Sequence, residues 1–187
     1  MDVKQVFIDS EAILEGHFLL SSGKHSNGYV QCAKLMMDPA KSKQVFALVA
    51  DKVKDLGIDV VVGPAIGGII PSYELASQLG IKSIFTERVE NIMTLRRGFS
   101  LEKGQKVIIS EDVVTTGKSS LETIKAIEEQ GVEVVGIACL VNRSGVEDID
   151  GYRIYSAIKL DIETYDKEDC PLCKDNLPID KPGSRKQ

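Results

Sequence analysis

Runs of apolar residues alternate along the chain with longer segments in which apolar residues recur at helical spacing. A continuous apolar run of about four to eight residues is typical of a strand that is buried on both faces of a sheet. Strands and helices in alternation predict a mostly parallel sheet flanked by helices, an α/β fold. The expected strands are residues 60–62, 82–86, 106–110, 134–142 and 154–158, and the expected helices are residues 39–57, a segment ending at 78, and 121–130.

The two ends of the chain differ from this central pattern. Residues 3–15 are expected to form a helix and residues 16–35 a hairpin-like region. Beyond residue 165 the sequence becomes polar and contains proline, which is typical of a surface tail. We therefore expect a single domain over 1–187, with a small N-terminal hood near 12–36, a core near 39–165 and a tail near 166–187.

Composition agrees with one globular domain. The chain has 187 residues, of which 43% are hydrophobic and 27% are charged, as is ordinary for a folded domain. The net charge of −5 argues against a general nucleic-acid surface. No signal peptide precedes Asp2, and no apolar run approaches the roughly 18 residues of a membrane span. We expect a cytoplasmic protein that binds neither nucleic acid nor membrane.

The most informative segment is residues 107–119. An apolar run is followed by two acids, Glu111 and Asp112, and then by a turn at 115–119 that is rich in hydroxyl groups. At the carboxyl end of a strand, backbone N–H groups and a helix N-terminus face outward together and can hold a phosphate. Gly117 permits the close backbone approach that a phosphate needs. The two carboxylates suit sugar hydroxyl groups better, with or without a hydrated Mg²⁺ nearby.

Two other phosphate-binding motifs are excluded by the same residues. A P-loop needs G-x-x-x-x-G-K-[ST], and the six residues before Gly117-Lys118-Ser119 begin with acids rather than glycine. The dinucleotide fingerprint G-x-G-x-x-G is absent. An ordinary strand, turn and helix with a surface acid pair remains the alternative interpretation.

A second glycine-rich turn follows the expected strand at 60–62. Its glycines, Gly63, Gly67 and Gly68, would let backbone amides approach another anionic group, although packing alone also explains such a turn. Ligands of parallel sheets bind outside the carboxyl ends of the strands, so both turns are expected to face one crevice. Two such turns favour one ligand with phosphates at both ends.

Residues 87–99 connect two expected strands without a clear helix and carry three arginines. We interpret this segment as a mobile lid that closes over a charged substrate. Arg88 lies immediately beyond the strand, and arginine can hold two phosphate oxygens at once. A solvated hairpin with ordinary surface arginines is the alternative.

The four cysteines fall into two groups. Cys32 and Cys139 lie in apolar or mixed segments and are expected to be small core residues. Cys170 and Cys173 have C-x-x-C spacing, which suits half of a zinc site, a redox pair or a tight turn. Zinc would need two more ligands, and both histidines are distant in sequence. A zinc site shared between subunits is therefore the metal alternative, and reduced, non-catalytic thiols are favoured.

Residues 107–119 resemble the signature of the type I phosphoribosyltransferases, a strand that ends in two acids followed by a T-T/A-G-x-S/T turn. Residues 16–29 are similar to the hood pattern G-x-F-x-L-x-S-G-x-x-S-x-x-[YF] of the orotate phosphoribosyltransferases, which purine transferases lack. With the Gly-Pro-Ala turn and Asn142-Arg143, the resemblance covers most of residues 12–145. Residues 86–88 and 93–99, with the terminal C-P-L-C, resemble the corresponding segments of a divergent branch of this family that is seen in thermophiles.

This resemblance implies the type I phosphoribosyltransferase fold, a homodimer, and transfer of the phosphoribosyl group of 5-phospho-α-D-ribose 1-diphosphate to orotate. The products would be pyrophosphate and orotidine 5′-monophosphate, in pyrimidine biosynthesis, with Mg²⁺ held through the substrate. Glu111, Asp112 and Arg88 would form the catalytic group. Phosphoribosyl diphosphate would contact Arg88, Glu111, Asp112, Val113, Val114, Thr115, Thr116, Gly117, Lys118 and Ser119, its pyrophosphate would lie at Ala65, Ile66 and Gly67, and orotate would contact Thr115, Arg143 and Tyr29.

The chain departs from the family at places where many members carry lysine or histidine. Ser21 or Ser22 stands in the hood, Gly67 follows the Gly-Pro-Ala turn, and the lid has neither lysine nor histidine. Two alternative functions would use the same phosphate-binding turn at 115–119. They are transfer to a purine or another base, and non-catalytic regulation by binding of phosphoribosyl diphosphate. In place of the missing groups, pyrophosphate is expected to be held by Arg88, Arg96, Arg97 or Lys24.

Overall fold

The computed structural model describes residues 2–20 and 22–182. Contacts divide the chain into two compact units. The large unit runs from Asp38 to Lys159, and the small unit combines the residues up to Met37 with those from Leu160 onward.

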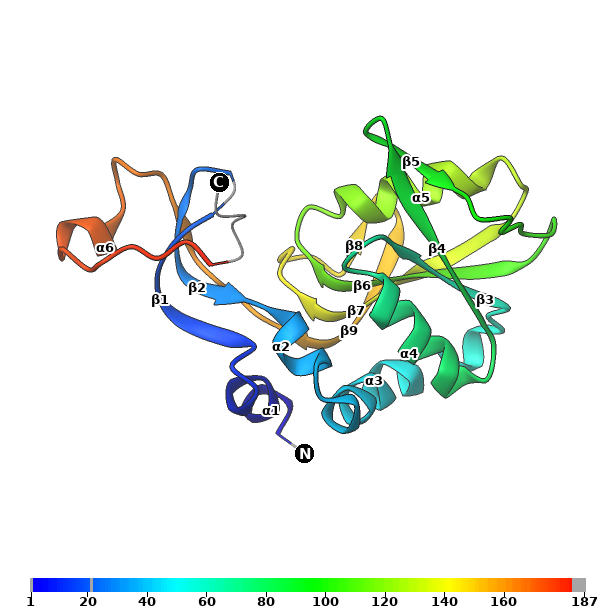
Figure 1. The fold of residues 1–187 in the computed structure, drawn as a ribbon, viewed down its shortest axis with the longest axis horizontal. Helices are drawn as coiled ribbons and strands as arrows, with labels where there is room; N and C mark the ends of the chain where they lie inside the picture. Colours follow the sequence, from blue (N-terminus) through cyan, green and yellow to red (C-terminus); the bar gives the residue numbers. More distant parts are fainter. Residues whose placement is uncertain (1, 21, 183–187) are drawn as a thin grey trace. The chain divides into compact units, whose positions relative to one another are not determined.

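The large unit contains a seven-stranded sheet in the order β5-β4-β3-β6-β7-β9-β8 (Figure 1). The five central strands are parallel, and β5 and β8 pair antiparallel at the two edges. The predicted α/β fold with a mostly parallel sheet is therefore confirmed. The strands are β3 (Val60–Pro64), β4 (Lys82–Val89), β5 (Ile92–Leu95), β6 (Lys106–Val114), β7 (Glu133–Asn142), β8 (Asp148–Ile149) and β9 (Tyr152–Lys159).

Helices cover both faces of this sheet, with α3 and α4 on one side and α5 on the other (Figure 1). The helices are α3 (Pro39–Val53), which continues into the short 3₁₀ helix η1 (Lys54–Leu56), α4 (Ile69–Leu79) and α5 (Lys118–Glu128). The Asp38 side chain caps α3 by accepting from the amides of Ala40 and Lys41, and Pro39 occupies the first turn. The helix predicted over 39–57 begins where expected and ends in a left-handed Gly57.

The core follows the alternation of side chains along the strands. One apolar cluster lies on the α5 side of the sheet and includes Val60, Val62, Val107, Ile109, Ile124, Ile127 and Ile137. The intervening residues Val61 and Ile108 point to the opposite face. They are fully buried, as are Phe46 of α3 and Leu75 of α4. Burial on both faces explains why these strands read as continuous apolar runs.

The direction of the chain across the sheet reverses between two adjacent parallel strands, β3 and β6. From β3 the chain passes through α4 to β4 on one side, and from β6 it passes through α5 to β7 on the other. Because such crossovers are right-handed, α4 and α5 lie on opposite faces. A ligand site is expected where the order reverses, at the carboxyl ends of β3 and β6.

The small unit contains a three-stranded antiparallel sheet in the order β1-β2-β10. The helix predicted over residues 3–15 is shorter than expected, because Glu11 takes a φ of 52° that ends it and Ile13 already begins β1. The apolar residues at 13 and 14 fit either spacing, which is why the prediction was wrong there. The elements are α1 (Val3–Asp9), β1 (Ile13–Leu19), β2 (His25–Val30), α2 (Cys32–Met36), β10 (Thr164–Tyr165) and α6 (Pro171–Lys174).

The polar C-terminal segment lies at the surface, but it is not a free tail. β10 pairs with β2, and the backbone of Asp180 bonds to both His17 and Leu19 on β1. These bonds join residues that are far apart in sequence, so no local sequence pattern predicts them. The end of the predicted tail, residues 183–187, lies outside the described residues. Among the residues that are described, no helix combines the length and apolar character that crossing a membrane requires.

Candidate active site

Strand β6 is longer than predicted and contains the acid pair. It continues to Val114 because it stays paired with β7, up to the match of Val114 with Asn142. Glu111 and Asp112 therefore lie inside the last part of the strand and not after it. Helix α5 begins at Lys118, three residues before the predicted start, so that only residues 115–117 form the turn.

The predicted phosphate cradle is a small polar recess of about 70 Å³. Glu111 and residues 113–120 line it. The first amides of an α-helix have no partner inside the helix and carry a partial positive charge, so the start of α5 supplies donors to this recess. Ser120 also lines it, and its buried Oγ has no hydrogen-bond partner among the described residues. The sequence signature stops at Ser119 and gave no signal for this hydroxyl group.

Gly117 closes the turn in a conformation that other residues adopt only with strain. Its φ is +71°, and a Cβ built on it would lie 2.7 Å from Cδ1 of Ile149 on β8. Glycine is therefore needed here both for the backbone angle and for space. The turn after β6 therefore lies close against Ile149 of β8.

Glu111 is buried and Asp112 half-buried in the last part of β6. Glu111 is 8% exposed. Burial and the neighbouring Asp112 charge raise the pKa of Glu111 to about 8. Burial also raises the pKa of Asp112, although a hydrogen bond of 2.8 Å from the Val113 amide to Oδ1 partly offsets it. Such groups favour partners that stabilise their negative charge, namely cations and hydroxyl donors.

The glycine-rich turn after β3 packs against Asp112 and the backbone just before the acid pair. A Cβ built on Gly67 would lie 3.1 Å from Asp112 Oδ1, and one on Gly68 would lie 2.7 Å from the Ser110 carbonyl oxygen. The Ala65 amide bonds to the Thr86 carbonyl at 2.8 Å, and the Ala65–Ile66 peptide is cis. The predicted pyrophosphate turn at Ala65, Ile66 and Gly67 thus adjoins Asp112 at the reversal point of the sheet.

Arg143 lies at the same edge of the sheet. It follows β7 directly, and its amide donates to the Val114 carbonyl at 2.8 Å. The turn beyond it is built on Asn142, whose amide group donates to the Val146 carbonyl at 2.9 Å and whose Oδ1 accepts from the Ser144 amide at 2.9 Å. Arg143 is therefore anchored beside the strand end that leads into Thr115.

The predicted lid at 87–99 folds as the β4–β5 hairpin in this structure, with Glu90 and Asn91 at positive φ in its turn. Arg88 forms an ion pair with Glu122 of α5 and is not placed in the cradle. Arg97 forms two bonds of 2.8 Å with Glu87, which lower the pKa of that carboxyl. A lid function and a pyrophosphate contact of Arg88 stay predictions.

Tyr29, the residue predicted to border the base, lies on β2 in the small unit. Its ring packs against Phe18, with 5.8 Å between ring centroids. Lys24, one of the cations proposed for pyrophosphate, forms an exposed ion pair with Asp166. The hood position Ser21 lies outside the described residues, and the contacts of Tyr29 with orotate stay a prediction.

The four cysteines lie in two kinds of environment. Cys32 and Cys139 are buried, as expected of core residues. The histidines are distant from Cys170 and Cys173 in sequence, and the expectation that they could not join these thiols in one chain was wrong. His17 and His25 lie together with both thiols in a single chain. The strands β1 and β2 carry the histidines to the C-terminal segment, so a zinc site shared between subunits is not required.

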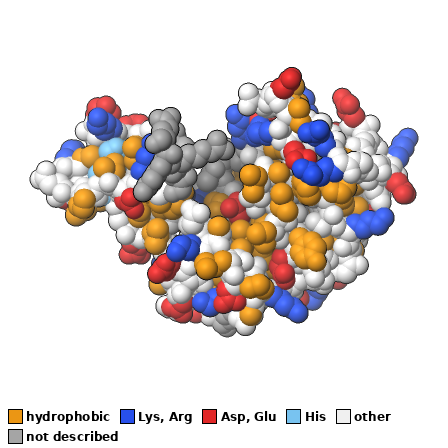
Figure 2. Space-filling model, viewed as in Figure 1, with side chains coloured by type: hydrophobic (Ala, Val, Ile, Leu, Met, Phe, Trp, Pro, Cys, Tyr) orange, Lys and Arg blue, Asp and Glu red, His pale blue; other side chains and the backbone are white. Residues whose placement is uncertain are grey.

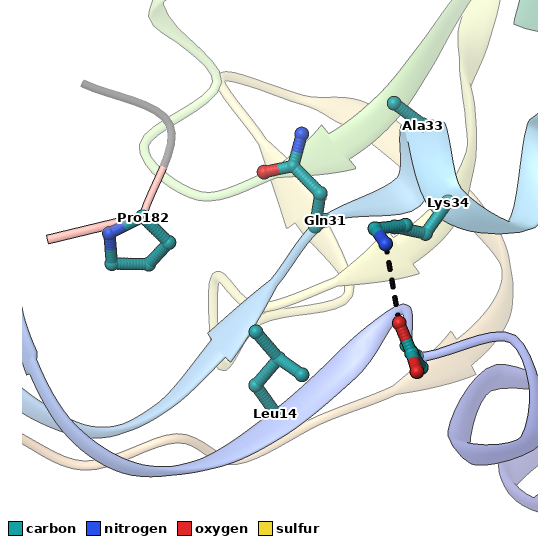
Figure 3. Close-up of a pocket in the computed structure, with 6 residues that line it drawn as sticks. Leu14, Gln31, Ala33, Lys34 and Pro182 are labelled. Atoms are coloured by element: carbon teal, nitrogen blue, oxygen red, sulfur yellow. Dashed lines mark hydrogen bonds and ion pairs between the residues drawn. The ribbon is translucent and has the colours of Figure 1, made fainter. Parts of the chain in front are cut away.

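Two larger cavities lie away from the acid pair. One of about 600 Å³ separates β5 from α5 in the large unit. Another, of about 420 Å³, lies in the small unit, where Leu14, Gln31, Ala33, Lys34 and Pro182 surround it (Figure 3). Its charged side chains, Lys34 and Glu11, neutralise each other at 3.1 Å. Neither brings together acids, glycine turns and a helix start, so the smaller recess at β6 is the better candidate.

Comparisons with known proteins show the family and the fold. Residues 38–165 match the phosphoribosyl transferase domain family. An orotate phosphoribosyltransferase from Caldicellulosiruptor bescii is 51% identical over 183 residues, which cover 98% of this chain and 96% of that protein. The structure of orotate phosphoribosyltransferase from Aeropyrum pernix superposes with a TM-score of 0.69 at 25% identity, covering 86% and 94% of the two chains. Adenine phosphoribosyltransferase from Thermoanaerobacter pseudethanolicus has a TM-score of 0.63 at 19% identity over 71% and 88%, which is a likeness of fold.

Proposed function

The chain belongs to the phosphoribosyltransferase family, among the orotate phosphoribosyltransferases, and on that premise we propose how its residues transfer a phosphoribosyl group to orotate. The substrate is 5-phospho-α-D-ribose 1-diphosphate, and the products are orotidine 5′-monophosphate and pyrophosphate. The observation that carries the proposal is the meeting of two anion-type turns with one acid pair at the reversal point of the sheet.

The cradle after β6 binds the 5-phosphate. Residues 115–119 surround it with hydroxyl groups and with the first amides of α5, and Ser120 adds a buried hydroxyl that needs a partner. Glu111 and Asp112 accept hydrogen bonds from the ribose 2- and 3-hydroxyl groups. The turn at Ala65, Ile66 and Gly67 lies beside Asp112 and receives the pyrophosphate end.

In the reaction N1 of orotate attacks the anomeric carbon with inversion, and pyrophosphate leaves with the electrons of the broken bond. Positive charge develops on the ribose ring in the transition state. Glu111 and Asp112 favour that charge in their ionised forms, because electrostatic interactions are strong where carboxylates are largely shielded from water. No protein nucleophile is needed, so catalysis consists of positioning and electrostatic stabilisation.

A magnesium ion fits the groups that surround this site. Mg²⁺ prefers oxygen ligands and usually binds through one or two carboxylates together with substrate phosphates. Glu111 and Asp112 offer such carboxylates, and Asp112 adjoins the turn assigned to pyrophosphate. When bound, the ion would neutralise the charge that builds on the leaving pyrophosphate.

Replacing Arg143 by alanine is expected to raise the KM for orotate by about 10- to 100-fold, because a charge-assisted bond to the orotate carboxylate is worth about 1.5–3 kcal/mol. The KM for phosphoribosyl diphosphate should change little. Steady-state rates, followed by the loss of orotate absorbance, measure both constants.

The matched control is Arg153→Ala, which removes an exposed arginine that stacks on Tyr155 of β9. It should leave both constants unchanged. If the parent protein consumes a purine and not orotate, the base assignment is wrong and the cradle assignment survives. If no base reacts, the protein is a binding regulator.

We further propose that a second copy of the chain packs on α4, as the family resemblance implies a homodimer. Ile70 and Tyr73 are 52% and 70% exposed and lie three residues apart on one face of the helix. Figure 2 shows hydrophobic side chains gathered over this part of the large unit. A patch of this kind on a helix is typical of an interaction site.

Ile70→Glu is expected to convert the dimer into a monomer, since a carboxylate buried in the interface would lack a partner. Light scattering coupled to size-exclusion chromatography measures the mass. Ile8→Glu changes another exposed isoleucine, on α1, and should leave the mass unchanged. If the Ile70→Glu protein remained a dimer, the interface would lie on another surface.

A cytoplasmic location also stays a prediction.

A further inference from the structure

Four side chains with metal-binding atoms converge in the small unit. His17 lies on β1, His25 on β2, Cys170 immediately before α6 and Cys173 within it. Their ligand atoms all lie within 4.8 Å of one another. The two histidines are 5% and 4% exposed, and Cys170 is fully buried.

The distances between these atoms suit a tetrahedral zinc ion. Zinc bonds of about 2.3 Å to sulfur and 2.0–2.1 Å to nitrogen place neighbouring N and S atoms about 3.5 Å apart. The observed distances are 3.3 Å from Cys173 Sγ to His25 Nδ1, and 3.6 and 3.8 Å from Cys170 Sγ and Cys173 Sγ to His17 Nε2. The two nitrogens are closer, at 2.8 Å. Moving these two nitrogens apart by about half an ångström would complete a tetrahedron.

A hydrogen bond outside the cluster sets the tautomer of one histidine. His17 Nδ1 lies 2.9 Å from the Leu177 carbonyl oxygen. A carbonyl oxygen only accepts, so a neutral His17 carries its proton on Nδ1 and turns the lone pair of Nε2 toward the thiols. Metal-binding histidines are oriented in this way by a partner on the other ring nitrogen.

The segment that carries the thiols has little else to hold it. Of residues 166–182 only Cys170 is buried, and α6 has four residues. So little buried apolar surface cannot fix a loop of this length, and small units commonly rely on a metal or a disulfide. The backbone pairs on both sides of the loop meet the ligand residues themselves, since Tyr165 pairs with His25 and the Asp180 amide bonds to the His17 carbonyl.

We propose that His17, His25, Cys170 and Cys173 bind one structural Zn²⁺ that fastens the C-terminal segment to the β1–β2 hairpin. All four coordination positions are filled by protein, so the ion has no open position for catalysis. Two thiolates and two imidazoles select zinc over Mg²⁺, which keeps this site chemically separate from the acid pair on β6. The proposal does not depend on which base the enzyme uses.

The test is metal analysis of the full chain, produced without a polyhistidine tag and with Zn²⁺ in the medium. About one zinc per chain is expected in the parent. Cys173→Ser changes an exposed position and should lower the zinc content at least tenfold. Cys139→Ala removes a buried thiol of β7 and should leave the zinc content unchanged. Chelation of the parent should lower Tm, and added Zn²⁺ should restore it.

A second measurement does not depend on how the variants fold. Co²⁺ added to the metal-free parent should give the visible bands of a tetrahedral ion and a thiolate charge-transfer band, and Zn²⁺ should abolish both. A zinc-free parent, a parent with a Cys170–Cys173 disulfide, or a Cys173→Ser protein that keeps its zinc would each overturn the proposal. Because none of these readouts is enzymatic, failure here is distinguishable from failure of the transferase assignment.

Discussion

Glu111→Gln is expected to raise the stability of the ligand-free protein near pH 8 and to lower its transferase rate by about 10²- to 10³-fold. Both effects have one origin. Burial and the Asp112 charge raise the pKa of Glu111 to about 8, so the folded protein is penalised when this carboxyl ionises. A glutamine carries no such penalty, and, unlike the ionised carboxylate, it cannot favour positive charge on the ribose ring.

The sign of the pH dependence follows from proton binding. Glu111 has an ordinary pKa of 4.5 and a folded pKa of about 8, so between these values the folded state holds a proton that the unfolded state has lost. Stability from this group is therefore fully present below about pH 4.5 and is lost as pH rises to about 8. The full loss is on the order of 5 kcal/mol. The free-energy difference between Glu111→Gln and the parent should grow over this window and then level off.

Urea unfolding of both proteins at a series of pH values measures this difference. Glu102→Gln is the control, because Glu102 is exposed on the large unit. It removes an exposed carboxyl in place of the buried one, so a pH-dependent difference confined to Glu111→Gln is assigned to burial. A Glu111→Gln curve parallel to that of the parent would mean that the carboxyl is already ionised at neutral pH, with a cation beside it. Phosphoribosyl diphosphate with Mg²⁺ should stabilise the parent more than the variant.

The acid pair and the two turns were found from sequence because their signals are local. The apolar run of β6, the acids and Gly117 are consecutive, and chemistry at the carboxyl end of a parallel strand follows from the fold class alone. The length of β6 was not predictable in the same way. Its extension through Glu111 depends on pairing with β7, which lies beyond a whole helix in the sequence.

The proposed zinc ligands show where sequence reasoning ends. His17 and Cys170 are 153 residues apart, and their approach depends on pairing of β10 with β2 and of Asp180 with β1. Neither pairing has a hydrophobic pattern, because the segment is short and mostly exposed. The C-x-x-C spacing indicated half of the cluster, and only the fold supplied the rest. The ion pairs of Arg88 and Arg97 were hidden for the same reason, since their partners are set by the hairpin register.

Gly117→Ala is expected to lower kcat/KM for phosphoribosyl diphosphate at least tenfold, through the shape of the cradle and not through a lost side chain. An alanine at a φ of +71° costs about 1–2 kcal/mol of conformational strain. Its Cβ would also lie 2.7 Å from Ile149 Cδ1, so either Ile149 or the turn must move. Because the phosphate is held by amides of the turn, displacement of the turn weakens the bonds that align the sugar.

Gly80→Ala separates strain from displacement. Gly80 has a φ of +70°, and apart from its own chain neighbours no atom of the described residues lies within 4 Å of the position that a Cβ would take, so alanine there should cost similar stability and leave kcat/KM unchanged. Ile149→Ala supplies the complementary test, because it opens the space that the new methyl group needs. In the double variant Gly117→Ala/Ile149→Ala, kcat/KM should recover toward that of Ile149→Ala, a coupling that a double-mutant cycle measures. Without recovery, the left-handed backbone of Gly117 itself, and not contact with β8, would be what the phosphate requires.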